Sequence, residues 1–450
     1  MQLSRKSLLV LLVLPLLYAL GTPAPVAAQE GAISGADTSW MLMSTALVLL
    51  MTPGLAFFYG GLVNSRNALN TMMMSFIALG VSGVLWAVVA YSLAFGAGGG
   101  LVGDLSMVVL RGVGTEPSGS IPHILFMAFQ GTFAIITAAL ISGALIGRMR
   151  FGPYVADIAL WGLLVYAPVA HWVWVGGWLS TFGGGALDFA GGTVVHVNAG
   201  VAALVAALVL GSRHDHSRTA LLPHNVPFVL LGAALLWFGW FGFNAGSALA
   251  SDEIAALAFV NTMLAPAAAL LVWALLEFRS SGKVTAVGVA TAIVVGLVAI
   301  TPASGFISPG YALLLGAIAA VPSFLVLQWR AGTRLDDTLD VFAAHGVGGA
   351  SGAILTGVFA TAAMGGASGL IDGNPGQVLI QAIAIIAVAV YTGAGTFIIL
   401  KVIGLVTPLR PSQGEEAVGM DILSHGEEAY ASADGSILIL DDEVSEGGVA

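Results

Sequence analysis

Two histidines lie in stretches of the sequence that are otherwise mostly small and apolar. His196 stands in "GGTVVHVNAG", residues 191–200, and His345 in "DVFAAHGVGG", residues 340–349. An imidazole can donate, accept or transfer a proton near neutral pH. An ionisable residue inside a lipid-embedded segment usually has a function. A single buried histidine is more often structural, but two in comparable surroundings favour a shared chemical role.

An aspartate precedes each histidine, Asp188 in "DFAGGTVVH" and Asp340 in "DVFAAH". A buried carboxylate could bind a cation, or it could accept hydrogen bonds from backbone N–H groups at a helix start, where negative charge is favoured. We expect the structural role for both. Helical rise, counted from the nearest arginines, places His196 about 25 Å and His345 about 16 Å from the cytoplasmic end. Taken literally, these depths differ by about 10 Å, so extended or tilted spans would be needed for the two histidines to meet.

Aromatic residues are dense in "AHWVWVGGW", residues 170–178, where an indole face could hold a cation with about 2 kcal/mol of attraction. The stretches "AFQGTFAIIT" and "WFGFNAGSA" add four rings, Phe129, Phe133, Phe241 and Phe243. Each ring alone is most simply explained by packing. The glycines between them allow backbones to approach, so the rings could line a narrow path.

Other residue types that support enzyme chemistry are sparse. There is no cysteine, which excludes disulfides and thiolate metal sites. His214 and His216, in "SRHDHSR", could form a weak metal site, but a solvated loop is the simpler interpretation. No activated nucleophile, metal-ligand cluster or phosphate-binding loop is visible. We therefore expect neither an enzyme nor a cofactor.

The composition is that of a membrane protein. Of 450 residues, 58% are hydrophobic and 8% are charged, whereas soluble domains carry about 25% charged residues. The net charge of −10 does not suit nucleic-acid binding, which needs clustered lysine and arginine. Residues 1–28 have Arg5 and Lys6, an apolar run and a Val-Ala-Ala ending, which predicts a cleavable signal peptide. An uncleaved first span is the alternative, which Pro15 and Pro23 disfavour.

Eleven hydrophobic stretches are each long enough to cross about 30 Å of hydrocarbon as a helix. They cover residues 38–62, 69–96, 121–147, 154–177, 192–210, 226–248, 254–278, 284–301, 308–329, 338–359 and 377–407. The sequence therefore predicts an all-α polytopic membrane protein. Residues 29–407 would form its transmembrane domain, and residues 408–450 a cytoplasmic tail.

Lysine and arginine gather after the odd-numbered stretches, as expected of cytoplasmic loops. These residues are Arg66, Arg148, Arg150, Arg213, Arg218, Arg279, Lys283, Arg330, Arg334, Lys401 and Arg410. Arg111 is the exception. The pattern predicts a periplasmic N-terminus, a cytoplasmic C-terminus and a location in the cell inner membrane.

An odd number of spans fits two five-helix halves of opposite orientation and one extra helix. Inverted repeats of this kind place binding sites near the middle of the membrane. The two halves share little visible sequence beyond an aspartate shortly before a histidine, in the fifth and tenth stretches.

Seven motifs between about Trp40 and Tyr430 are similar to those of a known family. They are "PGLAFFYGGLV", "FQGTFAIIT", "HWVWVGGW", "GALDFAGGTVVHVNAG", "WFGFNAGS", "ITPASGFISP" and "DDTLDVFAAHGVGG". With them the chain resembles the Amt/Mep/Rh ammonium transporter family, in particular its bacterial Amt members. The resemblance implies eleven helices with two inverted five-helix halves, a homotrimer with one pore per subunit, and ammonium or ammonia as substrate.

The resemblance also implies roles for residues of the outer mouth. Phe133 and Phe243 would be stacked rings that close it, and Trp174 and Ser247 would form the recruitment site for the ammonium ion. Asp188 would support that site and order the backbone without touching the ion.

Deeper in the membrane, the resemblance implies that His196 and His345 are paired pore histidines. At the cytoplasmic face it implies that residues 414–430, "GEEAVGMDILSHGEEAY", regulate the pore together with a PII-type signal protein. Residues 431–450 are acidic and have no counterpart in the expected pattern.

Together these features predict that ammonium is recruited outside, loses a proton and crosses as ammonia. Two other interpretations stay open: an ammonium sensor that signals through its tail with little conduction, and a pore for another small gas. The alternative to a functional histidine pair is a purely structural role for both residues. That role conflicts with the free-energy cost of burying unpaired polar groups.

Overall fold

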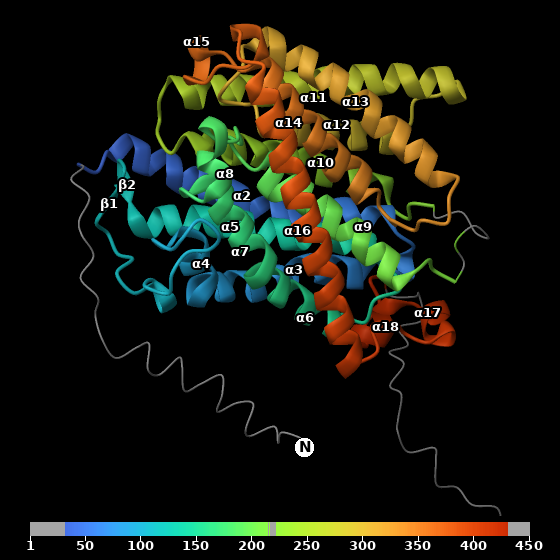
Figure 1. Ribbon diagram of the computed structural model, residues 1–450. Helices are drawn as coiled ribbons and strands as arrows, with labels where there is room; N and C mark the ends of the chain where they lie inside the picture. The colour runs from blue at the N-terminus through green and yellow to red at the C-terminus, as the bar shows by residue number, and fades with distance from the viewer. Residues whose placement is uncertain (1–31, 215, 217–221, 431–450) are drawn as a thin grey trace, which may run out of the picture.

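The computed structural model describes residues 32–214, 216 and 222–430. The predicted signal peptide and residues 431–450 lie outside this part of the chain. Within it the protein is almost entirely helical, apart from a two-stranded hairpin formed by β1 (Pro117–Ser118) and β2 (Ile121–Pro122) (Figure 1). The predicted all-α membrane fold is confirmed.

The first half of the chain contains five membrane-spanning segments, several of which combine α-helix with a π-helical turn. The elements are α2 (Gly35–Leu62); α3 (Ala68–Leu85) with η2 (Trp86–Ala90) and α4 (Tyr91–Phe95); α5 (His123–Ile141); α6 (Phe151–Trp161) with η5 (Gly162–Tyr166), α7 (Ala167–Trp174) and α8 (Trp178–Thr181); and η7 (Gly192–Val197) with α9 (Asn198–Leu210).

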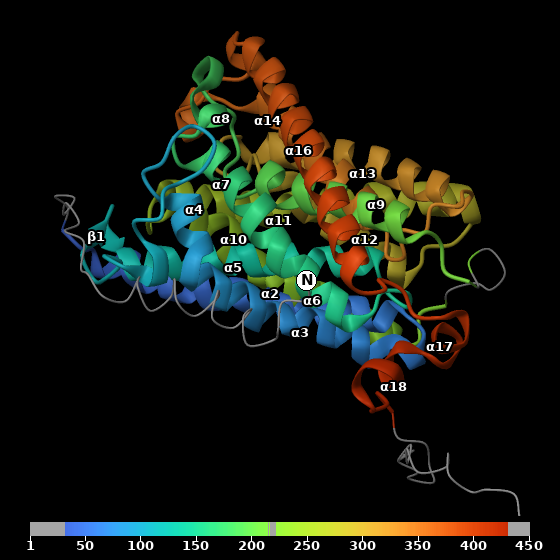
Figure 2. The same cartoon turned by 60° about the horizontal axis from the view of Figure 1, so that its bottom comes forward.

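The second half follows the same plan and ends in a long helix and a short tail. Its elements are α10 (Val226–Ala245); α11 (Glu253–Ser281); α12 (Ala286–Ile300); α13 (Pro309–Ala331); η9 (Phe342–Val347) with α14 (Gly348–Phe359); α15 (Ala362–Gly365); α16 (Gly376–Val406); α17 (Gln413–Val418); and α18 (Met420–His425). Helix α16 crosses the other helices obliquely in Figures 1 and 2.

Ten helical segments in the described part of the chain are long and apolar enough to cross a membrane. The eighth predicted span, residues 284–301, is the apolar helix α12, which has 15 residues. Fifteen residues rise only about 22 Å, less than the hydrocarbon thickness of about 30 Å. The predicted count of eleven is therefore not confirmed by helix length alone.

Corresponding helices of the two halves pack against each other. Helix α2, the first of its half, makes its most extensive contact with α10, the first of the other half. Glycines allow this approach: a Cβ on Gly61 would lie 2.6 Å from the Asn225 carbonyl oxygen, and one on Gly232 would lie 2.3 Å from the Phe58 nitrogen. Small residues promote helix contacts of this kind in membranes.

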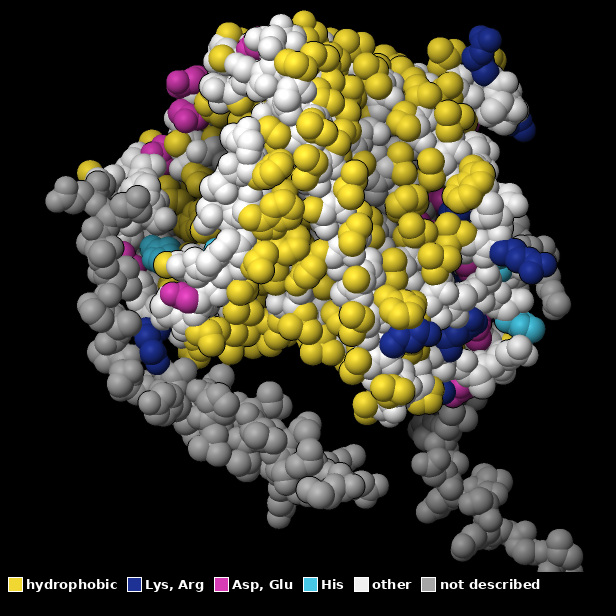
Figure 3. Space-filling view, in the orientation of Figure 1, with side chains coloured by type: hydrophobic (Ala, Val, Ile, Leu, Met, Phe, Trp, Pro, Cys, Tyr) yellow, Lys and Arg dark blue, Asp and Glu magenta, His cyan; other side chains and the backbone are white. Residues whose placement is uncertain are grey.

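The surface has an apolar band between two more polar ends. In Figure 3 hydrophobic side chains cover the middle of the molecule, and most visible lysine and arginine side chains lie at the end that also carries the tail. Exposed leucine, phenylalanine and valine side chains on α11, α13 and α16 belong to this band, among them Leu271, Leu325 and Val390. Such a surface suits contact with lipid.

One buried acidic residue stands apart from this pattern. Asp157, on α6, is fully buried, and neither carboxyl oxygen has a hydrogen-bond partner. Replacing Asp157 with valine is expected to raise the melting temperature, because an unpartnered buried polar group costs about 1–3 kcal/mol. The isosteric Asp157→Asn variant keeps unpartnered polar atoms and should melt near wild type. Thermal unfolding in detergent measures both, and a valine variant that melts below the asparagine variant would contradict the prediction.

Candidate functional site

The two intramembrane histidines meet at the centre of the molecule. Nδ1 of His196 lies 3.2 Å from Nδ1 of His345, and the ring centroids are 5.3 Å apart. Both side chains are buried, and Nε2 of His196 has no hydrogen-bond partner in the protein. A hydrogen bond between the two Nδ1 atoms needs one hydrogen between them, so the two rings have complementary donor and acceptor roles. The pair can share or pass on a proton.

The depth difference of about 10 Å that the literal count of helical rise gave for the two histidines is therefore not present in the structure. The estimate assumed continuous helix between each histidine and its nearest arginine. Helix α9 ends at Leu210, and Arg213 lies in the loop beyond it. Arg334 is not on the helix of His345, which begins only near Phe342. The rise per residue of a helix does not apply across these loops.

Glycines bring the two histidine helices together. Gly200 follows His196 by four residues, and a Cβ at this position would lie 2.2 Å from the Gly346 nitrogen. Gly349 follows His345 by four residues, and its Cβ would lie 2.9 Å from the His196 Cβ. Because residues four apart share one helix face, each histidine lies on the same face as a glycine that contacts the other helix. The rings can meet only because these backbones touch.

A carboxylate caps the start of each histidine helix. Asp188 accepts four backbone N–H groups, from Gly191 and Gly192 at Oδ1 and from Thr193 and Val194 at Oδ2, at 2.5–3.0 Å. This geometry agrees with the structural role expected for Asp188. Its own carbonyl oxygen also accepts the indole N–H of Trp174 at 3.0 Å.

In the second half of the chain, the start of the histidine helix is capped by a different residue from the one predicted from the sequence. Oδ2 of Asp337 accepts the Phe342 N–H at 2.7 Å, whereas Asp340 accepts a hydrogen bond from Arg330 Nε and has φ of 58°. The expectation that Asp340 accepts backbone N–H groups at the helix start is therefore corrected to Asp337. Asp340 and Arg330 both line a large cavity at the end of the molecule that carries the tail.

This correction reveals a repeat that the sequence analysis missed. Asp188, His196 and Gly200 have the same spacing as Asp337, His345 and Gly349, namely Asp-x7-His-x3-Gly. Choosing Asp340 as the partner concealed this spacing. The matching interval between cap, histidine and glycine could have identified both Asp337 and the two glycines.

Two stacked rings lie beyond the histidines, on the side away from the tail. The centroids of Phe133 and Phe243 are 4.1 Å apart with an interplanar angle of 24°. Trp174 meets Phe133 edge-on at 6.0 Å. The Ser247 hydroxyl donates to the Phe243 carbonyl at 2.9 Å, so Ser247 is linked to Trp174 through the two phenylalanine rings. All four predicted outer-mouth residues therefore belong to one cluster.

Below these rings the path is narrow and apolar. A cavity of about 10 Å³ lies between Phe243 and the two histidines, and its other lining residues are apolar. That volume is close to the least that one water molecule needs. His345 also lines a second cavity, of about 680 Å³, which extends to Arg213, Arg330 and Glu277 at the end of the molecule that carries the tail. The histidine pair thus separates a tight apolar passage from a wide vestibule whose lining includes charged residues.

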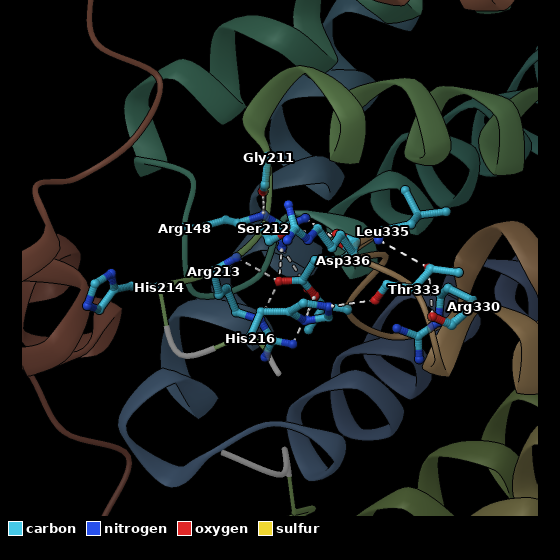
Figure 4. Close-up of polar contacts among 12 residues, drawn as sticks. Arg148, Gly211, Ser212, Arg213, His214, His216, Arg330, Thr333, Leu335 and Asp336 are labelled. Carbon is cyan, nitrogen blue, oxygen red and sulfur yellow. Dashed lines mark hydrogen bonds and ion pairs between the residues drawn. The ribbon is translucent and has the colours of Figure 1, made fainter. Parts of the chain in front are cut away.

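An ionic cluster around Asp336 joins three loops at this end (Figure 4). Arg213 donates to both carboxyl oxygens of Asp336 at 2.8 and 2.9 Å. The fully buried Arg148 forms an ion pair with Asp336 at 3.8 Å and also donates to the Gly211 carbonyl. Burial alone would raise the pKa of Asp336, but the hydrogen bonds from Arg213 and the charges of both arginines outweigh it and hold the pKa far below its usual value.

The suggested histidine metal site is not assembled here. His216 Nδ1 lies 3.5 Å from Asp336, while the backbone N–H of His214 donates to Glu416 of the tail. Figure 4 shows the His214 ring turned away from His216. In the described ranges no group of three or more histidine, aspartate or glutamate side chains is placed to hold a metal.

The tail is folded against the loops of the same end. Asp421 accepts the backbone N–H groups of Leu69 and Asn70 at 3.0 and 2.8 Å, and Glu416 pairs with Arg410 at 2.6 Å. A capping box of Ser412 and Glu415 starts α17. Between α17 and the body lies a cavity of about 70 Å³ that Arg213 lines together with Glu416, so Arg213 faces both the vestibule and the tail.

These features define a class of protein: a multi-pass membrane transporter or channel with a narrow apolar path for a small solute. The family model of the Ammonium Transporter Family matches residues 39–430, and the chain belongs to that family.

The chain is similar to known proteins along almost their whole length. The chain is 48% identical to the ammonium transporter of Bacillus subtilis over 400 residues, which cover 88% of this chain and 98% of that one. Its fold is similar to that of Saccharomyces cerevisiae Mep2, with TM-score 0.80 and 35% identity over 86% of this chain and 91% of that chain. It is also similar to a structure described as a sensor Amt protein, with TM-score 0.80 and 29% identity over 87% and 98% of the two chains.

Gly200→Ala is expected to disrupt the histidine pair, because the added methyl group overlaps the Gly346 backbone. Overpacking of this kind costs about 1–3 kcal/mol, and the shift needed to relieve it moves His196 away from His345. Ammonium uptake into proteoliposomes and the melting temperature should both fall. Gly393→Ala on α16 is the control, since its Cβ would lie 3.7 Å from its nearest neighbours. Equal behaviour of the two variants would contradict the role of Gly200.

Asp336→Asn is expected to lower the free energy of unfolding by about 3 kcal/mol, because it leaves buried arginines without their counter-charge. Since the folded pKa of Asp336 lies below the unfolded value, its ionised form stabilises the protein above about pH 4, and this contribution disappears as the pH falls through the folded pKa. Melting temperatures between neutral and acid pH measure this: the variant should lose less stability on acidification than wild type. Glu415→Gln, which removes a half-exposed pair with Arg150, should change little.

Proposed function

We propose that this protein carries ammonium across the membrane by binding the ion at the outer aromatic cluster, removing one proton and conducting ammonia past the histidine pair. The observation that carries the proposal is the pair itself, two buried imidazoles in contact at the end of an otherwise apolar cavity. Membership of the ammonium transporter family supplies the substrate.

The energetics of the passage favour ammonia over the ion. Burying an isolated charge in an apolar medium costs tens of kcal/mol in the Born limit. Deprotonating ammonium, whose pKa is about 9, costs about 3 kcal/mol at pH 7, since one pKa unit corresponds to 1.36 kcal/mol. A cavity with room for about one water molecule and an apolar lining therefore conducts the neutral form, provided that a nearby group handles the proton.

The outer cluster is suited to the first step. Trp174 and Phe133 present ring faces and edges, and a desolvated cation over an indole gains about 2 kcal/mol. Ser247 provides a hydroxyl group beside Phe243. In this proposal Trp174 and Ser247 hold the ion, while Phe133 and Phe243 must separate slightly before anything passes.

The histidine pair is suited to the second step. The hydrogen shared by the two Nδ1 atoms makes their tautomers complementary, and Nε2 of His196, a residue that lines the apolar cavity, has no hydrogen-bond partner in the protein. It can hydrogen-bond the passing ammonia and, in the tautomer that leaves Nε2 unprotonated, accept the proton that ammonium releases. The contact between the two Nδ1 atoms then passes a proton on to His345, so that ammonia and the proton both cross and the transport carries charge. Potassium has no proton to give and should be rejected although its size is similar.

The same proposal includes the setting of the protein in the cell. Positive residues at the tail end (Figure 3) support a cytoplasmic C-terminus and a periplasmic N-terminus in the inner membrane. The ordered helices α17 and α18 support a regulatory tail that a PII-type signal protein engages. A homotrimer and a part in nitrogen metabolism follow from the family resemblance.

The second candidate is an ammonium sensor, favoured by the likeness to a sensor Amt protein and by the tail packed beside the vestibule. A sensor would bind ammonium at the same outer cluster and conduct little. A pore for another small gas would share the apolar path but should not discriminate for ammonium.

His196→Ala is expected to reduce the ammonium-evoked current of purified protein on a supported membrane about a hundredfold, the lower end of what proton transfer contributes. The current should be ammonium-specific in wild type, with potassium as the reference ion. His224→Ala is the matched control, because His224 bonds Val63 and Tyr430 at the loop end and lies off the path.

Each result distinguishes the candidates. A variant that keeps wild-type current and selectivity would reject the role of His196. Absence of current together with ammonia uptake, read by an internal pH dye, would show neutral conduction. Absence of both signals, with ammonium still binding, would favour the sensor.

A further inference from the structure

The glycine-rich loop that follows α4 is tied to the end of α7 by three successive carbonyl groups. The Gly99 oxygen lies 2.7 Å from His171 Nε2, the Gly100 oxygen accepts the Trp178 N–H at 3.0 Å, and the Leu101 oxygen accepts the Trp172 indole N–H at 2.7 Å. All three donors belong to the "HWVWVGGW" motif. The motif therefore holds an outer loop as well as presenting aromatic rings.

His171 contacts this loop in a way that constrains its charge. Its Nδ1 lies 2.9 Å from the Ala94 oxygen, at the end of α4, and the side chain is 2% exposed. Both partners of the ring are carbonyl oxygens, which only accept. A neutral imidazole has one N–H group and the protonated ring has two. Both contacts are hydrogen bonds only when the ring carries both hydrogens.

The backbone of His171 closes the turn that carries Trp174. Its carbonyl oxygen accepts the N–H groups of Val175 and Gly177 at 3.4 and 3.2 Å. A Cβ at Gly177 would lie 2.4 Å from that oxygen, so only glycine permits this close turn. One residue thus anchors the loop through its ring and the end of α7 through its carbonyl group.

Several ionisable groups lie on the elements that pack around α7. Those that form hydrogen bonds form them with residues other than His171. Tyr91 bonds His123, Asp104 accepts from Ser106, Asp188 accepts four backbone N–H groups, and Tyr391 donates to Leu164. The Tyr166 hydroxyl, in η5, has no partner. Within the described ranges no carboxylate forms a hydrogen bond or ion pair with His171, so only the carbonyl groups favour its second hydrogen.

We propose that His171 is a positioning residue of the outer ammonium site, whose doubly protonated ring fixes the 99–101 loop to the end of α7 and thereby sets the position of Trp174. This inference rests on the proposed function of Trp174. Loss of one ring hydrogen replaces a hydrogen bond with two opposed lone pairs, which loosens the loop and the turn. The affinity for ammonium then depends on the charge of a group that never touches the ion.

His171→Gln tests this role with a side chain that donates but cannot change its charge. The ammonium concentration for half-maximal current should rise roughly fivefold, within the range by which residues remote from a ligand alter its binding. The maximal current should stay near wild type, because the histidine pair is untouched.

His123→Gln is the matched control, since His123 also lies at the outer end but its ring faces the Tyr91 hydroxyl and Glu116. It should leave the half-maximal ammonium concentration unchanged. A half-maximal concentration in His171→Gln that equals the wild-type value overturns the proposal. Trp174→Leu distinguishes the positioning role of His171 from the existence of the outer ammonium site. An unchanged half-maximal ammonium concentration in this variant rejects the outer site itself. A raised value in Trp174→Leu with a wild-type value in His171→Gln rejects only the positioning role.

Nitrogen-15 spectra of histidine-labelled protein test the ring directly and do not depend on transport. The signals of His171, assigned by their absence in His171→Gln, should show two protonated nitrogens under the conditions of the transport measurement. A neutral ring under those conditions overturns the proposal even if the variant folds poorly.

Discussion

The centre of this molecule depends on a backbone contact between two helices in a medium that offers no water to polar groups. Gly200 lies against Gly346, and Gly349 against the backbone around His196, so that two imidazoles reach hydrogen-bond distance inside the helix bundle. Any side chain at these glycines would separate the helices. The hydrogen bond between the rings, the narrow cavity above them and the vestibule below them all follow from this approach.

The starts of the same two helices show how the membrane constrains backbone hydrogen bonding. Their first N–H groups cannot reach water, and each unsatisfied group would cost several kcal/mol. Asp188 and Asp337 accept these groups, and Asp188 also fixes the Trp174 ring through its carbonyl oxygen. The outer aromatic cluster and the histidine helix therefore share one support, while the charged cluster at Asp336 fastens the opposite end.

Much of the fold could be predicted, because hydrophobic length and the distribution of arginine are strong signals in membrane proteins. Helix α12 shows the limit: its residues are apolar, but its helical part is shorter than the stretch that the sequence suggested. The candidate site residues were predicted by motif. Their mutual position was not, since rise per residue fails across the loops at Arg213 and Arg334. The role of Asp337 was missed because three aspartates lie within five residues, and only the backbone shows which one caps the helix.

The width of the cavity between Phe243 and the histidines determines how solute molecules can move through it. Its volume of about 10 Å³ is near the least that one water molecule needs, so two solute molecules cannot lie side by side there. In the proposed path, movement is therefore single-file, and tracer fluxes in the two directions are not independent of one another. A molecule that enters the proposed path from the vestibule delays one that enters from the opposite end, so solute accumulated on one side slows entry from the other by occupancy as well as by the gradient.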